Sequence, residues 1–85
     1  MEAFALLAAL KARGNLLSEP RSSVIETGLL ELRGHQVRIF YMFRPGRRIV
    51  LLDGMIKKRD AIPREVLDRV RGFKRDLERR EQKPS

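Results

Sequence analysis

The sequence of 85 residues contains no cysteine, no tryptophan and a single histidine. The absence of cysteine excludes disulfide bonds and thiolate metal sites, so neither can stabilise the fold. One histidine excludes catalysis by a histidine pair and most histidine-rich metal sites. We therefore expect neither a metal nor another cofactor.

Aromatic residues are also scarce, at 6% of the chain, and most of them fall in segments that read as core strands. This scarcity argues against a small ribosome- or phage-associated RNA-binding protein that stacks bases on exposed rings.

No hydrophobic run is long enough to span a bilayer, so we expect no membrane association. The apolar segment 3–10 could serve as the core of a signal peptide. However, Glu2 stands where a basic residue is needed and no clear cleavage site follows, so we expect a cytoplasmic protein.

Acidic side chains are the minority: 11 against 19 lysines and arginines, for a net charge of +8. Residues 29–60 hold eight of the basic side chains and only three of the acidic ones. So concentrated a charge in so small a chain favours a polyanionic partner such as nucleic acid, the ribosome or an acidic protein.

The hydrophobic patterning predicts a helix, three strands and a second helix. A run rich in Ala and Leu ends with basic residues before Gly14, as helices do. The expected elements are a helix over Glu2–Arg13, a connector over 15–28, strands over Leu29–Arg33, 36–43 and 48–55, and a helix that starts at Pro63.

Together these elements predict an α+β fold: an N-terminal helix, a three-stranded antiparallel sheet and a C-terminal helix, with the helices on one face of the sheet. We expect one domain over residues 1–81 and a disordered tail over 82–85. The segment 36–43 is apolar on nearly both faces and is therefore expected to be the central strand.

Two arginines, Arg33 and Arg38, flank the short turn at Gly34-His35 and should lie opposite one another in a hairpin. Adjacent guanidinium groups repel unless an anion bridges them, and arginine offers a bidentate fork for a phosphate or carboxylate. The spacing leaves two interpretations open: a site for an external anion, or a solvated strand end in which Glu31 is the partner.

The cationic run Lys57-Lys58-Arg59 follows the third strand and allows two interpretations, a grip on a phosphate backbone or an exposed basic loop. Tyr41 could stack a base or donate a proton, although its apolar neighbours favour a core tyrosine. Asp53 is unexpected within an aliphatic strand and is expected to pair with a nearby arginine.

The order of these segments resembles the RelE/ParE superfamily of type II toxins, and within it the HigB-like branch derived from phages. The resemblance covers about residues 5–75. Its most specific part is the ordered set Glu31-Leu32-Arg33, Arg38, Tyr41, Gly54 and Lys57-Lys58.

The resemblance implies an endoribonuclease that cleaves messenger RNA, often in the ribosomal A site, through attack of a ribose 2′-hydroxyl on the adjacent phosphate. Arg33 and Arg38 would hold the scissile phosphate, and Lys57 and Lys58 would supply charge or proton transfer. Tyr41 would be a supporting group of the site or would stack on a base of the RNA. The further RNA contacts would come from Arg44, Arg47, Arg48 and Arg59, and a helix-turn-helix antitoxin would cover the basic face.

The chain departs from the pattern of that superfamily in four respects. Asp53 replaces a usual histidine, Met55 replaces a usual aromatic residue, and residues 59–62 replace a stretch usually rich in Thr and Gln. The strand and helix that commonly open the fold are missing before Met1. A fold without its first strand would expose a sheet edge, through which the chain could form oligomers.

A second hypothesis is a basic module without catalytic activity. It would be either a ParE-type toxin that inhibits DNA gyrase by binding, or a truncated remnant that binds only an antitoxin or RNA. Primer extension separates the two hypotheses, because a gyrase inhibitor leaves transcripts intact.

Overall fold

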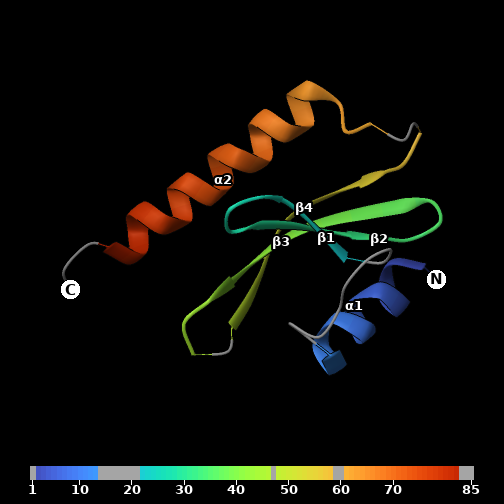
Figure 1. Cartoon of the computed structure of the whole chain (residues 1–85), viewed down its shortest axis with the longest axis horizontal. Helices are drawn as coiled ribbons and strands as arrows, with labels where there is room; N and C mark the ends of the chain where they lie inside the picture. Colours follow the sequence, from blue (N-terminus) through green and yellow to red (C-terminus); the bar gives the residue numbers. More distant parts are fainter. Residues whose placement is uncertain (1, 14–21, 47, 59–60, 83–85) are drawn as a thin grey trace.

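The computed structural model describes residues 2–13, 22–46, 48–58 and 61–82, and it shows the expected α+β class (Figure 1). The elements follow the order α1 (Glu2–Arg13), β1 (Ser22–Glu26), β2 (Leu29–Arg33), β3 (Val37–Arg44), β4 (Arg48–Ile56) and α2 (Arg64–Gln82). Helix α2 reaches Gln82, so the rest of the predicted tail, 83–85, lies outside the described residues.

The sheet has four strands in the order β1-β2-β3-β4, each antiparallel to the next. The prediction of three strands was therefore wrong by one, because β1 lies within the expected connector. Serines and Gly28 suggested a loop, but Ser22 is buried opposite Leu32, and Gly28 at φ 78° forms the tight turn into β2. The predicted lack of the opening strand and helix of the superfamily is not tested by this structure and stays a prediction.

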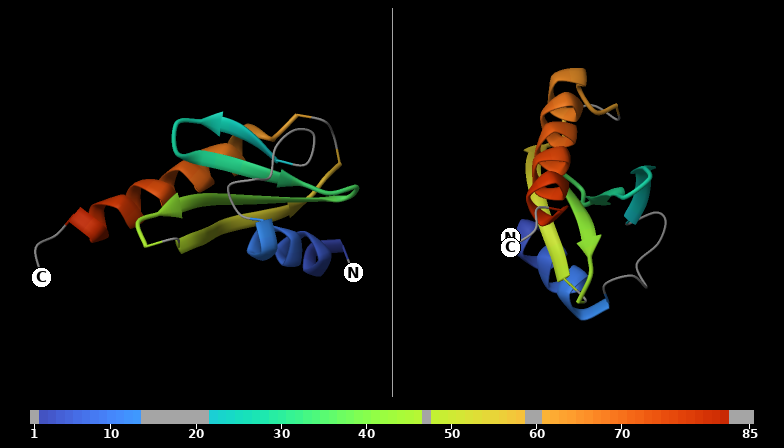
Figure 2. Two further views of the ribbon diagram at one scale, coloured as in Figure 1. Left: turned by 60° about the horizontal axis from the view of Figure 1, so that its bottom comes forward. Right: turned by 90° about the vertical axis from the view of Figure 1, so that its left-hand side faces the viewer.

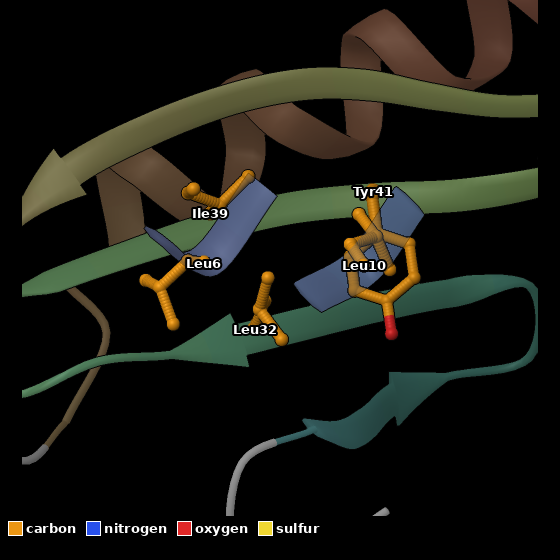
Figure 3. Close-up of a cluster of buried hydrophobic side chains, with 5 residues drawn as sticks. All are labelled: Leu6, Leu10, Leu32, Ile39 and Tyr41. Atoms are coloured by element: carbon orange, nitrogen blue, oxygen red, sulfur yellow. The ribbon is translucent and has the colours of Figure 1, made fainter. Parts of the chain in front are cut away.

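The two helices pack on opposite faces of the sheet, so the prediction that they share one face was wrong. Leu6 and Leu10 of α1 pack on Leu32, Ile39 and Tyr41 (Figure 3). Helix α2 lies on the other face (Figure 2). There, its side chains that reach the sheet join a core built on Leu29, Phe40 and Val70. The reason lies in β3, whose alternate apolar residues face both ways and require a helix on each side.

Helix α1 buries only one side of its apolar surface. Leu6 and Leu10 are 4% and 2% exposed, whereas Phe4 is 77% exposed. Its apolar residues surround the axis, but among the described residues the helix packs against the sheet alone, and an apolar side faces solvent.

Strand β4 contains a bulge that directs two neighbouring residues toward α2. Phe40 pairs with Asp53 and Tyr41 with Leu51, so Leu52 has no direct cross-strand partner. Leu52 consequently packs in the core beneath α2, while Asp53 reaches an arginine of that helix.

Within the described ranges, no helix is both long and apolar enough to cross a membrane.

Substitution of Gly34 and of Gly72 by alanine is expected to change stability in opposite directions. A Cβ at Gly34 would press on the Glu2 carboxylate and lie 2.8 Å from Leu6 Cδ1, whereas a Cβ at Gly72 would meet open space. We expect Gly34→Ala to lower the free energy of unfolding by about 1–3 kcal/mol. Gly72→Ala, within α2, should raise it by roughly 0.5–1 kcal/mol. Urea denaturation measures both, and equal effects of the two variants would contradict the close packing at Gly34.

Candidate functional site

The first arginine pair lies at one end of the β2–β3 hairpin. Arg33 and Arg38 are direct cross-strand partners, as their spacing predicts, and their side chains share the sheet face that α2 covers. Two guanidinium groups are thus adjacent at the end of the two central strands.

A buried carboxylate joins this pair. Glu31 Oε2 accepts a 2.7 Å hydrogen bond from Arg38 Nη1, and Glu31 Oε1 lies 3.7 Å from Arg33 Nε. The hydroxyl of Ser23 donates to Glu31 Oε1 at 3.1 Å. Glu31 is therefore a partner of both arginines, as one interpretation held, but the strand end is not solvated. The Arg38 side chain is 4% exposed, and only that of Arg33, at 31%, reaches solvent.

An open cavity of about 640 Å³ lies beside this cluster. Arg33, His35 and Lys57 line it from the sheet, and α1 contributes Glu2, Ala5 and Leu6. The backbone N–H of Lys57 donates to the Gln36 carbonyl at 2.6 Å, which holds the end of β4 beside the β2–β3 turn. Lys58, which follows, is exposed.

Glu2 fixes one wall of the cavity. Its Oε1 accepts hydrogen bonds from the backbone N–H groups of Gln36 and Val37, at 2.5 and 2.8 Å. The first turn of α1 is thereby attached to the β2–β3 turn. Neither Glu2 nor His35, which seemed a turn residue only, was predicted from the sequence to belong to the site, because contacts between distant segments leave no local pattern.

Tyr41 lies apart from the arginine pair, on the opposite face of the sheet. Its side chain is 1% exposed beneath α1, and its hydroxyl shares a 2.6 Å hydrogen bond with that of Ser22. Its ring meets Phe43 edge-on, with centroids 5.5 Å apart. The structure gives Tyr41 the position of a core tyrosine.

Arg44 and Arg48 are also separate from the first pair. They are cross-strand partners at the other end of β3, six residues beyond Arg38, or roughly 20 Å along a strand. Both bind Glu81 of α2, a partner that the sequence analysis did not anticipate. The remaining two candidate RNA contacts, Arg47 and Arg59, lie outside the described residues.

The arrangement at the first pair suits anion binding. Arg33 and Lys57 line one cavity, and fixed cations of this kind stabilise charge that develops on phosphate oxygens. In the part of the chain that the structure describes, no three histidine or carboxylate side chains are grouped to hold a metal ion.

Comparison with protein families assigns the chain to a family. The family model described as Phage derived protein Gp49-like (DUF891) matches residues 1–74. The chain belongs to this family. Gp49-like proteins are a RelE/ParE-like toxin family, which establishes the broader resemblance but not the HigB-like branch. No curated protein matches the chain.

Asp53, the acidic residue that replaces a usual histidine of the superfamily, has its charge neutralised within the fold of this Gp49-like chain. Asp53 Oδ2 accepts a 2.6 Å hydrogen bond from Arg69 Nε on α2, and Asp53 Oδ1 accepts one from the Gly54 N–H at 2.8 Å. The expected pairing with a nearby arginine is confirmed. Because Asp53 is bound to α2, its charge is compensated away from Arg33.

We expect Glu31→Gln to destabilise the Gp49-like fold strongly, because it leaves the buried charge of Arg38 without its carboxylate. Breaking a buried pair lowers the free energy of unfolding by roughly 3–5 kcal/mol. Urea denaturation measures this change. Glu78→Gln is the matched control, because Glu78 pairs with Lys74 within α2 and is far less buried than Glu31, at 34% against 7% exposed, so it should change stability by no more than about 1 kcal/mol. Equal losses in the two variants would refute a structural role for Glu31.

The carboxyl of Glu81 should titrate at unusually low pH. The hydrogen bond from Arg44 lowers its pKa below the ordinary value, desolvation opposes this, and the charges of Arg44 and Arg48 lower it further. A depressed pKa means that the contact stabilises the fold above the pKa of the unfolded chain. This contribution is lost as the pH falls through the pKa of the folded chain.

NMR titration of the carboxyl carbon measures this pKa directly. In the Arg44→Ala variant the pKa of Glu81 should rise toward its ordinary value. An unaltered Glu81 titration in Arg44→Ala would contradict the assignment.

Proposed function

We propose that this Gp49-like chain is the toxin of a type II toxin–antitoxin system and that it cleaves messenger RNA. The observation that carries the proposal is the placement of Arg33, with Arg38 behind it, beside Lys57 on one open cavity. Membership of a toxin-like family supports the general class. Cleavage, dependence on the ribosome and the HigB-like branch belong to the proposal.

The proposed reaction needs no histidine. The ribose 2′-oxygen attacks the adjacent phosphorus, the bond to the 5′-oxygen breaks, and the products are a 2′,3′-cyclic phosphate and a 5′-hydroxyl. The proton of the 2′-hydroxyl passes to solvent water, and another proton reaches the 5′-oxygen. Lys57, which lines the cavity, can supply the second proton or balance the charge of the leaving oxygen.

The two arginines are suited to different tasks. Arg33 reaches solvent and can take a non-bridging phosphate oxygen, which carries more negative charge in the transition state. Arg38 is buried and held by Glu31, so it acts by positioning Glu31 and Arg33. Lys57 lines the same cavity, and Lys58 can contact the neighbouring backbone. Tyr41, on the other face, has no part in this mechanism.

The partners follow from the same surface. A helix-turn-helix antitoxin that covers the cavity would block access of RNA to Arg33 and Lys57. Messenger RNA, presented by the ribosome in the cytoplasm, is the proposed substrate. The strands β1 and β4 are the two edges of the sheet, and oligomer formation through either edge stays a prediction.

One observation favours the second candidate function, a binding module without catalysis. Glu31 already occupies the space between Arg33 and Arg38, and the Arg38 side chain is only 4% exposed. A phosphate would therefore meet one arginine rather than two. Inhibition of DNA gyrase, or binding of an antitoxin or RNA alone, would need only the exposed charges.

Induced expression of the chain should arrest growth, and primer extension should show new 5′ ends within transcripts. Arg33→Ala should reduce cleavage by about 100-fold or more, since it removes a group that stabilises the transition state. Arg75→Ala is the matched control, because it removes an equal charge from an exposed position on α2, and it should cleave as the parent does.

Thermal melting of both variants verifies that they fold. Growth arrest with intact transcripts would support the binding module instead, and cleavage that persists in folded Arg33→Ala would exclude the proposed role of Arg33.

A further inference from the structure

A second arginine pair closes the other end of the sheet around a single carboxylate. Arg44 and Arg48 are cross-strand partners at the β3–β4 turn, and Glu81 from the last turn of α2 lies between them. Arg44 Nε and Nη2 bind Glu81 Oε2 at 2.9 and 2.7 Å. Arg48 Nη2 lies 3.1 Å from both carboxylate oxygens. Figure 2 shows the end of α2 beside the tip of this hairpin.

This cluster has the same arrangement as the cluster of Arg33, Arg38 and Glu31, but its glutamate is more exposed to solvent. In both, a glutamate joins two arginines that face each other across a hairpin. Glu31 is 7% exposed and belongs to the sheet itself, so it cannot leave without unfolding β2. Glu81 is 21% exposed and Arg48 is 55% exposed, and their contact depends on one helix turn.

Glu81 occupies a position that its own helix disfavours. A negative charge in the last turn opposes the negative end of the helix dipole. The α2 side chains that join the core are Val66, Leu67 and Val70, all in the first half of the helix. The arginine pair is therefore the described contact that fixes the last turn, and helix ends fray readily.

The surroundings favour a phosphate as a replacement for this carboxylate. Arg79 and Arg80 precede Glu81 in the same turn and are exposed, so the end of α2 carries further positive charge. A phosphodiester offers oxygens to the bidentate fork of Arg44 and further negative charge to the neighbouring arginines.

We propose that Arg44 and Arg48 form a second binding site, for the phosphodiester backbone of RNA, which Glu81 occupies until RNA displaces the last turn of α2. That RNA is the ligand rests on the proposed function. The displaceable contact of Arg44 and Arg48 with Glu81, here called the clamp, rests on the geometry alone. The site lies at the opposite end of β3 from Arg33, so it would bind a part of the RNA distant from the cleaved bond.

The experiment measures binding without cleavage. The probe is a fluorescent 2′-O-methyl oligouridylate of about 12 nucleotides, which lacks the 2′-hydroxyl nucleophile, and anisotropy gives its dissociation constant at several salt concentrations. Glu81→Gln should bind about three- to tenfold more tightly than the parent, because the competing ion pair is gone. The slope of the logarithm of the binding constant against the logarithm of the salt concentration should also become steeper by roughly one unit.

Glu78→Gln is the control for net charge, because it removes an equal charge one turn earlier and pairs with Lys74 rather than with the hairpin. It should change affinity less than about twofold. Adding Arg44→Ala and Arg48→Ala to Glu81→Gln should abolish the gain. Circular dichroism verifies that each variant is folded.

Three results would overturn the proposal. The first is equal affinity of Glu81→Gln and Glu78→Gln, and the second is a gain that survives removal of both arginines. The third is competition by a polyglutamate peptide as strong as that by unlabelled RNA, which would indicate an acidic protein segment as the ligand.

Cleavage of unmodified RNA is measured separately, so failure of the proposed nuclease activity is distinguishable. Intact RNA with the Glu81→Gln gain retained would refute the nuclease and leave the clamp. Cleavage of RNA without the affinity gain of Glu81→Gln would support the nuclease and refute the clamp.

Discussion

The burial of β3 on both faces is the constraint from which the architecture follows. Ile39 and Tyr41 need cover on one side of the sheet and Phe40 on the other, so two helices must pack on opposite faces. Each helix supplies only a few side chains to its core, and β3 supplies residues to both. The strand therefore fixes the positions of α1 and α2 relative to one another.

The same strand explains where the basic residues can act. Arginines lie at its two ends, and each is matched to a partner across a hairpin. One glutamate per pair is enough to keep two guanidinium groups together while a net positive charge remains. Charge that would destabilise the middle of a core strand is thus kept at its margins, where a glutamate compensates it even at Arg38, whose side chain is only 4% exposed.

Much of the fold could be predicted from the sequence, since residue composition, hydrophobic patterning and turn residues determine both helices, β2, β3 and β4. Strand β1 could not, because Ser22 resembles a loop residue until its hydroxyl meets Tyr41. Of the site, only the pairing of Arg33 with Arg38 followed from spacing. Glu2 and Glu81 were missed because carboxylates that bind across more than thirty residues leave no local signal.

The meander order of the sheet also bears on how the chain folds. Every strand pairs with its neighbour in sequence. The two turns that the structure describes in full, β1–β2 and β2–β3, are short. The sheet can therefore form through small loop closures, each with a modest entropic cost, and such topologies fold quickly. Each helix then docks on its own face, independently of the other. Loss of one helix would leave the opposite core largely formed, so the chain is expected to open in two separate units rather than all at once.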